Sequence, residues 1–264
     1  MPEGHTIHRL ARDQAKDLVG TDVKIRAWSP QGRFSDSAAR IDGHAIDRID
    51  AHGKHLFHSI DDGQVLHVHL GLIGKFQRRV APIADPVGMV RLRLEGPTAA
   101  WDLSGPMICR LIDAGEQAAT IGTLGPDPLR RDADPQRFVD KALASKKEIG
   151  ALLLDQSVIA GIGNVYRAEV LFLLGIDPRT PGNRLSEEQL VALWDELVAL
   201  LREGLKRNRI VTLRAEDRDR PLNRMSKLES LYVYHHEICR RCGTAITPIE
   251  VAGRRIDVCP TCQR

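Results

Sequence analysis

The sequence lacks any apolar run long enough to cross a membrane. Residues 1–20 carry His, Arg, Asp and Lys where a secretory signal peptide would carry an apolar core. These absences argue against a membrane protein and against a secreted one, so we expect a soluble, cytoplasmic chain. Its 264 residues suffice for two domains of ordinary size with buried cores.

Cysteine is scarce outside the last 26 residues, which excludes a disulfide framework spread over a secreted fold. Only Cys109 lies elsewhere, in the apolar stretch MICRLI, where we expect a buried, small hydrophobic side chain. The other four cysteines form two Cys-x-x-Cys pairs with a 16-residue gap, and they are Cys239, Cys242, Cys259 and Cys262. This spacing predicts one structural zinc with four thiolate ligands and no catalytic role. A redox dithiol would need one pair and a thioredoxin-like unit, which is not visible.

The 16 residues between the cysteine pairs read as a hairpin that is too short to fold without the metal. Arg254 and Arg255 follow Gly253 in this hairpin. Basic residues at such a turn either face solvent or bind phosphate, and the sequence leaves both interpretations open.

Charge is distributed unevenly along the chain. From Leu201 onward there are 14 Lys and Arg against 8 Asp and Glu, a net of +6, and before it there are 24 against 27, a net of −3. This asymmetry indicates an anionic partner for the C-terminal part, although a solvated charged face is the more common cause of such a run.

Hydrophobic periodicity changes near the middle of the chain. Residues 21–119 alternate with period two between frequent turns, which predicts an antiparallel sheet or sandwich, and a helix over 4–19 would pack against it. The proline-rich stretch 124–135 is typical of an interdomain linker. A helical pattern then follows, including a capping box at Ser186 and the apolar stripe Leu190, Leu193, Trp194, Leu197 and Leu201. The charged stretch 216–227 has no apolar period and predicts a mobile loop.

A glycine turn, Gly161-Ile162-Gly163-Asn164, separates two apolar helical segments. Taken alone, it indicates a helix corner with Asn164 as a helix cap, or an anion site at the start of the second helix.

Several segments in order resemble the formamidopyrimidine-DNA glycosylase and endonuclease VIII family: MPEGHTIHRLA at the start, HGKHLF, HLGLIGKF, LGPDPL, LLLDQSVIAGIGNVYRAEVLF and VCPTCQ. The resemblance covers nearly the whole chain. It implies an α+β fold, in which an antiparallel β-sandwich with flanking helices precedes a helical domain with a helix–two-turn–helix motif and a zinc-finger β-hairpin. The expected domains are the catalytic sandwich (1–121), a linker (122–135), the helix–two-turn–helix domain (136–230) and the zinc finger (231–264).

The resemblance assigns catalysis to the first residues of the chain. In the family the initiator Met is removed and the new N-terminal proline is the nucleophile, which here is Pro2. An α-amino group has a pKa near about 8, so a useful fraction is neutral at cellular pH. Glu3 would be the general acid that protonates the opening sugar ring, a role that favours a site sheltered from water. Lys54 matches a lysine that contacts phosphate beside the lesion and assists catalysis.

The resemblance also implies DNA contacts. Asn164 and Arg254 match phosphate-binding residues, with Arg255 as second choice, and together with Lys54 they would grip the backbone of a nucleotide whose base is turned out. Leu72 stands where the purine-directed branch carries a methionine that fills the gap, and a wedge role fits its apolar bulk.

Two departures favour the endonuclease VIII side of the family. The stretch WDLSGPM, 101–107, lacks the arginine and phenylalanine of the purine-directed branch, and the loop 216–227 lacks its glycine-rich sequence. We therefore expect oxidised pyrimidines, and single-stranded or bubble DNA besides duplex DNA. Five histidines between His52 and His69 alternate along strands, so we do not expect a second metal there.

The predicted function is that of a monomeric base-excision repair enzyme, nucleoid-associated if bacterial. It would be a bifunctional DNA glycosylase and abasic-site lyase acting by β,δ-elimination through a proline Schiff base. The alternatives are a damage-binding protein without catalysis, an oxidised-purine glycosylase, and a zinc-ribbon protein that contacts only proteins.

Overall fold

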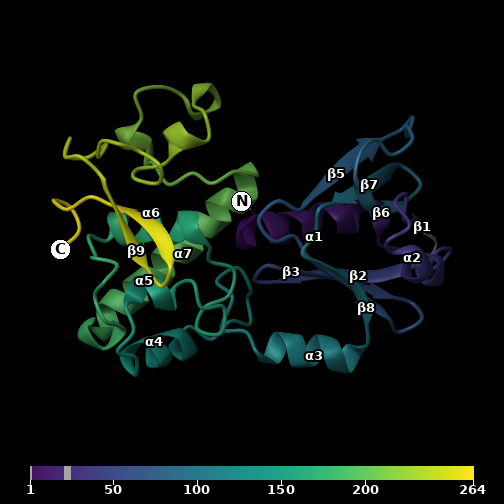
Figure 1. The fold of residues 1–264 in the computed structure, drawn as a ribbon, viewed down its shortest axis with the longest axis horizontal. Helices are drawn as coiled ribbons and strands as arrows, with labels where there is room; N and C mark the ends of the chain where they lie inside the picture. The colour runs from purple at the N-terminus through teal and green to yellow at the C-terminus, as the bar shows by residue number, and fades with distance from the viewer. Residues whose placement is uncertain (1, 21–24) are drawn as a thin grey trace. The chain divides into compact units, whose positions relative to one another are not determined.

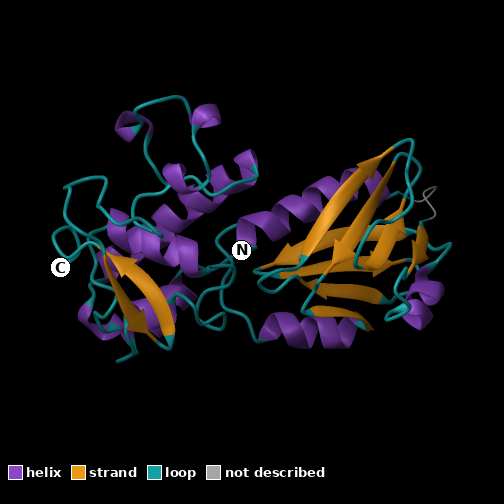
Figure 2. Cartoon of the chain, turned by 45° about the horizontal axis from the view of Figure 1, so that its top comes forward, coloured by secondary structure: helices purple, strands orange, loops and turns teal. Residues whose placement is uncertain are grey.

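The computed structural model describes residues 2–20 and 25–264, so Met1 and the start of the predicted sheet region at Thr21 lie outside the described residues. The chain divides into two compact units, Met1–Thr123 and Leu124–Arg264 (Figure 1). The first unit contains two antiparallel sheets and the second is mainly helical with a C-terminal hairpin (Figure 2). The predicted α+β class is confirmed. None of the helices within the described ranges is both long and apolar enough to cross a membrane.

Two four-stranded sheets form the first unit. One has the order β1-β6-β7-β5 and the other β2-β3-β4-β8, and every strand pair in them is antiparallel. Their bounds are β1 Arg26–Trp28, β2 Ile46–His52, β3 His55–Ile60, β4 Val65–His69, β5 Lys75–Val80, β6 Val90–Glu95, β7 Ala99–Ser104 and β8 Ile108–Ile112.

The main core of this unit is shared by both sheets and by helices α1, Gly4–Leu18, and α2, Ser35–Ile41. Alternation along β3 sends Leu56 into this core and Phe57 to the other face, where it packs with helix α3, Ala114–Gly122. The period-two pattern predicts strands as far as Ala119, and α3 corrects that boundary. A capping box between Asp113 and Glu116 starts this helix.

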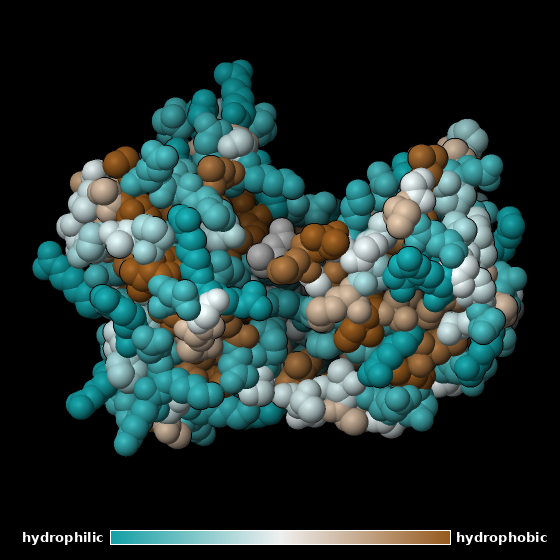
Figure 3. All heavy atoms as spheres, in the orientation of Figure 1, coloured by the Kyte–Doolittle hydropathy of each residue, from teal (hydrophilic) through white to brown (hydrophobic). Residues whose placement is uncertain are grey.

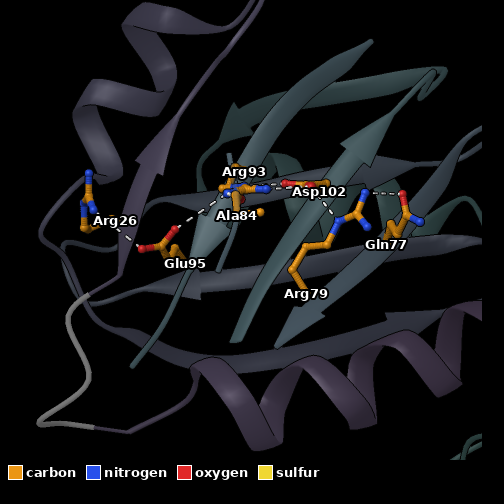
Figure 4. A network of polar contacts seen from close by, with 7 residues as sticks. All are labelled: Arg26, Gln77, Arg79, Ala84, Arg93, Glu95 and Asp102. Carbon is orange, nitrogen blue, oxygen red and sulfur yellow. Dashed lines mark hydrogen bonds and ion pairs between the residues drawn. The ribbon is translucent and has the colours of Figure 1, made fainter. Parts of the chain in front are cut away.

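A buried ion pair joins two neighbouring strands of the first sheet (Figure 4). Arg93 on β6 donates to both carboxylate oxygens of Asp102 on β7, at 2.5 and 2.8 Å, and both side chains are about 2% exposed. Arg93 also donates to the carbonyl of Ala84, and Arg79 reaches Asp102 from β5. Each charge is thus satisfied by hydrogen bonds, as burial of an ion pair requires.

The second unit begins with residues of the predicted linker. Gly125 N donates to Gln156 O at 2.8 Å, and a Cβ at Gly125 would lie 2.4 Å from the carbonyl of Val158. Residues 124–128 are buried, so this part of the stretch packs into the second unit.

The helices of this unit are α4 Gln136–Leu143, α5 Ile149–Leu152, α6 Asn164–Leu173 and α7 Glu187–Arg207, and the hairpin strands are β9 Thr247–Val251 and β10 Arg254–Val258. The predicted capping box at Ser186 is present, and the predicted stripe on α7 is buried. The stretch 216–227, predicted to be a mobile loop, overlaps two short 3-10 turns, Ala215–Asp217 and Leu222–Arg224. Arg209 donates to the carbonyls of Met225 and Ser226 and so ties the stretch to the end of α7.

Candidate active site

The first residues of the chain lead directly into α1. Glu3 is the N-cap residue, in an extended conformation, and its carbonyl accepts from Thr6 N at 2.9 Å. Its side chain is completely buried, whereas Pro2 is partly exposed. The predicted acid therefore lies in a site sheltered from water, next to the predicted nucleophile in sequence.

The start of α1 and the turn that carries Lys54 lie at the same end of the second sheet. Val19, just after α1, pairs with Ile46, and Gln14 Oε1 accepts from Nε2 of His58 in the middle of β3 at 2.7 Å. From Gln14 back to His5 the helix rises about 14 Å, and from His58 back to His55 the strand extends about 10 Å. Both paths run toward the β2–β3 turn (Figure 1).

Lys54 occupies a two-residue turn between His52 and His55, which pair across β2 and β3. Gly53 has a φ of +58°, a conformation that tight hairpin turns require. Burial lowers the pKa of His69, and the positive charge of Lys54 lowers it further. Lys54 directly precedes His55, which pairs with His69, so Lys54 lies at the end of the sheet where β3 begins and β4 ends.

The rings of three histidines, His55, His67 and His69, pack together beside this turn. His55 Nδ1 lies 2.8 Å from His67 Nε2, and the rings of His55 and His69 meet edge to face with centroids 4.9 Å apart. Burial lowers the pKa of His55 to about 3 and that of His67 to about 4, so both rings are neutral at cellular pH. Within the described residues, the only group of side chains with metal-ligand spacing is the four cysteines described below, and the histidines are not part of it.

Leu72 lies in the β4–β5 turn and is 62% exposed. Two other apolar side chains accompany it: Ile73 in the same turn, 84% exposed, and Met107 in the β7–β8 turn, 65% exposed. Met107 N donates to His69 O at 2.9 Å, and a Cβ at Gly71 would lie 2.9 Å from Met107 Cβ. The two turns are thus in close contact, and Ile73 and Met107 are further candidate site residues for which the sequence pattern gave no prediction.

In the second unit, Asn164 is not the helix cap that the isolated sequence pattern indicated. The N-cap residue of α6 is Gly163, and Asn164 is the first helical residue. Asn164 Nδ2 donates to the carbonyl of Arg255 at 3.0 Å, while its Oδ1 accepts from Arg167 at 2.6 Å. The Asn164 side chain therefore joins α6 to the start of β10.

Arg254 and Arg255 have different surroundings although they are neighbours. Arg255 donates to Asp257 through Nε at 2.9 Å, with Nη2 at 2.8 Å from the same carboxylate. Arg254 is exposed and, in the part of the chain that the structure describes, its side chain has no ion pair. This difference favours Arg254 as the residue available to an anionic ligand.

Arg167, which the sequence analysis did not single out, is fully buried beneath this junction. Its guanidinium donates to the carbonyls of Gly150 and Arg255 and to the Asn164 side chain. Two residues later, buried Glu169 accepts from the backbone N–H groups of Tyr232, Val233 and Tyr234 and from the Thr212 hydroxyl. A signal was present in the sequence, because both charges interrupt the otherwise apolar segment NVYRAEVLFLL.

The four predicted metal ligands come together at the base of the hairpin. Their sulfur atoms all lie within 4.8 Å of one another, at 3.9 Å between Cys239 and Cys262 and 3.5 Å between Cys242 and Cys259. A tetrahedral zinc with bonds of about 2.3 Å would separate its sulfur ligands by about 3.8 Å. The cluster therefore fits one structural zinc, in agreement with the prediction.

Three sequence families match consecutive parts of the chain. The formamidopyrimidine-DNA glycosylase N-terminal domain matches residues 1–103, the formamidopyrimidine-DNA glycosylase H2TH domain matches 124–215, and the zinc finger found in FPG and IleRS matches 237–264. The chain belongs to the formamidopyrimidine-DNA glycosylase and endonuclease VIII family, which confirms the resemblance in its sequence.

Full-length relatives carry both names of this family. The chain is 45% identical to endonuclease 8 1 of Mycobacterium tuberculosis, over 100% of both chains, and 31% identical to a formamidopyrimidine-DNA glycosylase of Geobacillus kaustophilus, again over 100% of both. Among solved structures, a Lactococcus lactis FPG mutant in complex with a Fapy-dG containing DNA superposes with a TM-score of 0.80 at 28% identity, covering 100% of each chain.

Proposed function

We propose that this protein is a bifunctional DNA glycosylase and abasic-site lyase of base-excision repair. The observation that carries the proposal is the placement of Pro2 and buried Glu3 at the start of α1, at the end of the sheet that also presents Lys54 and Leu72. The catalytic residues lie in the domain 1–121, and the domain 136–230 and the zinc finger 231–264 bind the DNA.

The chemistry requires removal of Met1, which frees the secondary amine of Pro2. The amine attacks the anomeric carbon of the damaged nucleotide, the bond to the base breaks, and the base leaves with a proton. Glu3 protonates the ring oxygen as the sugar opens, which leaves an iminium between Pro2 and the sugar. The iminium accepts electrons as a proton leaves the neighbouring carbon, so that the 3′ and then the 5′ phosphate are eliminated.

The DNA backbone is bound by Lys54 in the first unit and by Asn164 and Arg254 in the second. The ordered surroundings of Asn164 support this role, because Arg167 and the Arg255 carbonyl hold its amide in one orientation. Arg255 is the weaker candidate, since its guanidinium is paired with Asp257. Relatives of this fold have been solved bound to DNA containing an abasic site, which agrees with an abasic substrate here.

The wedge that replaces the extruded base consists of Leu72, Ile73 and Met107. All three are exposed and apolar, and the close contact between their turns presents them together. Proteins that open base steps commonly insert such side chains. Because the three wedge side chains carry no charged group to bond to the opposite base, we expect weak opposite-base discrimination. The sequence departures at 101–107 and 216–227 favour oxidised pyrimidines as substrates.

Borohydride reduction with abasic-site DNA tests the lyase. Wild-type protein should form a covalent adduct, whereas Pro2→Gly and a form that retains Met1 should form none. DNA binding by wild-type protein without any trapped adduct would instead establish a damage-binding protein that lacks catalysis.

A second experiment tests the substrate class. Oligonucleotides with an oxidised cytosine or thymine should be cleaved faster than those with an oxidised guanine. Preferential release of the guanine lesion would place the enzyme among oxidised-purine glycosylases. Met107→Arg provides a probe of the wedge, because it should make cleavage more dependent on the base opposite the lesion, while Met89→Arg, on an exposed methionine outside these turns, should not.

A further inference from the structure

A pocket of about 510 Å³ lies within the second unit, between the segment before α5 and the tip of the β9–β10 hairpin. Three basic residues line it: Lys146 and Lys147 from the α4–α5 connection, and Arg254 from β10. Arg254 is more than 100 positions from the two lysines in sequence, so only the folded zinc finger brings the three charges to one place.

The two segments are held together by close packing and by the buried Arg167 rather than by the basic side chains of the pocket. A Cβ at Gly150 would lie 3.2 Å from Val251 of β9, and Arg167 donates to both the Gly150 and the Arg255 carbonyls. In the described part of the chain, Lys146, Lys147 and Arg254 form no side-chain ion pair. Their charges therefore remain available to a ligand in the pocket.

Two acidic residues also line the pocket, and each has another partner. Asp155 accepts from the Ser157 hydroxyl and backbone N–H at 2.6 and 3.0 Å, and these bonds, with smaller effects of Lys147 and Lys141, lower its pKa. Glu148 lies near Arg179, whose pKa is raised mainly by Asp177 and to a smaller extent by Glu148. The pocket is thus lined by three cationic and two acidic side chains, and each acid also interacts with a residue outside the pocket: Asp155 with Ser157, and Glu148 with Arg179.

The pocket also adjoins the proposed phosphate-binding pair Asn164 and Arg254, here called the phosphate clamp, because Arg254 lines the pocket. Asn164 bonds to the carbonyl of the next residue, Arg255, and so sits beside the same end of β10. A DNA strand carries one phosphate charge per about 3.4 Å of helix axis, so a strand held at Asn164 brings further phosphates past this surface. A site for a lone small anion would not explain why the pocket shares Arg254 with the proposed phosphate-binding residues.

We propose that Lys146 and Lys147 bind a further backbone phosphate of DNA, next to the phosphate held by Asn164 and Arg254. This inference rests on the proposed function, because it assumes that the strand follows the clamp. The two lysines act as positioning residues that hold the DNA in register and take no part in the chemistry at the sugar.

The salt dependence of DNA binding tests the inference. With full-length, zinc-loaded protein and abasic-analogue duplex, the slope of log K against log salt should fall by about 0.9 for each phosphate that the protein no longer neutralises. Between 50 and 200 mM salt, the affinity of the Lys146→Ala and Lys147→Ala double variant should thus fall about 3.5-fold less than that of wild type if one phosphate is released. The matched control is Arg202→Ala, which removes a positive charge from the exposed side of α7 and should leave the slope unchanged.

A change of opposite sign sharpens the test. Glu148→Gln removes an acid from the pocket and should tighten DNA binding at low salt, and this gain should be absent in the lysine double variant. Replacing single phosphates of the DNA by neutral methylphosphonates should weaken wild-type binding at one position that no longer matters in the double variant.

Failure of the inference differs from failure of the proposed function. Borohydride trapping at saturating, low-salt DNA should be normal in the lysine variants, so a missing adduct in wild type would overturn the function itself. Normal trapping with an unchanged salt slope in the double variant would overturn only the proposal that Lys146 and Lys147 bind a DNA phosphate. Competition by pyrophosphate at matched ionic strength, together with an unchanged slope, would show that the pocket takes a small anion instead of DNA.

Discussion

In the unit from Met1 to Thr123, the proposed site residues lie at the start of α1 and on turns between strands, whereas in the second unit they depend on one helix and a metal-bound hairpin. Lys54 and Leu72 are positioned by local turns of paired strands. Asn164 and Arg254 are positioned by buried Arg167, which bonds to backbone carbonyls almost 90 residues away. The site residues of the first unit are thus held by turns between neighbouring strands of one sheet. Those of the second unit are held by a few hydrogen bonds between residues far apart in the sequence.

Figure 3 shows that both units nevertheless present a mixed surface, with hydrophilic side chains over most of this face and separate apolar patches. The difference between the units therefore lies in their interiors. A sheet distributes its stability over many backbone hydrogen bonds, while a junction of single buried groups concentrates it. We therefore expect that removal of one buried polar side chain will impair the site of the second unit more than removal of one will impair the site of the first unit.

The largest effect should follow loss of zinc. Cys259→Ser or chelation should unfold the hairpin, because structural zinc supplies about 10–16 kcal/mol of apparent binding free energy in small fingers. DNA binding should disappear, while hydrogen exchange in the first unit stays unchanged. Cys109→Ser, in β8 of the first unit, is the matched control. DNA binding that survived in Cys259→Ser would mean that the finger, and with it Arg254, is dispensable.

The next largest effect concerns the ion pair of the first unit. Asp102→Ala leaves the Arg93 guanidinium buried without its carboxylate and should lower the free energy of unfolding by about 3–5 kcal/mol. Chemical denaturation measures this loss. If the sheet holds the turns as we argue, the folded fraction should still form the borohydride adduct at a normal rate. A folded variant that no longer forms the adduct would show that the first site also depends on one polar link.

Glu169 offers the corresponding test in the second unit. Glu169→Ala removes the acceptor of three backbone N–H groups and should lower the free energy of unfolding by about 3 kcal/mol or more. Unlike the Asp102 variant, it should also weaken DNA binding in the folded fraction, because the segment that Glu169 holds, from Tyr232 to Tyr234, leads into the zinc-binding segment that begins at Cys239. The control Glu203→Gln breaks an exposed pair with Arg207 and should cost under about 1 kcal/mol. If the folded Glu169→Ala and Asp102→Ala proteins bound DNA with equal affinity, the second site would not depend on single polar links more than the first site does.

A smaller effect should appear in the pH dependence of stability. The buried histidines of the first unit have folded-state pKa values of about 3 for His55 and about 4 for His58, below the ordinary value of 6.5. As pH falls below 6.5, the unfolded chain binds protons that the folded chain does not, so the folded state loses stability until these lower pKa values are reached. The melting temperature should therefore fall between pH 6.5 and 5, and His55→Gln should reduce the slope. A flat profile would show that the cluster is solvated.

Much of the fold was accessible from the sequence because the relevant signals are local. Period-two alternation predicted the sheets, the Ser186 capping box placed the start of α7, and Cys-x-x-Cys spacing predicted the zinc site. The helix α3 was missed although its capping box is also local, because the strand pattern before it was extended too far. The roles of Pro2, Glu3 and Lys54 came from the order of family motifs, which periodicity alone does not contain.

The sequence by itself determined the zinc ligands, the proline and acid at the N-terminus and the membership in the family, since each depends on residue type and spacing along the chain. Only the tertiary structure decided that Met107 joins Leu72 and Ile73, that Arg167 fixes Asn164 against the hairpin, and that two lysines share a pocket with Arg254. These contacts join residues from about 35 to more than 100 positions apart in the sequence. Strand pairing and hairpin docking create them, and no local pattern in the sequence specifies which distant partners will meet.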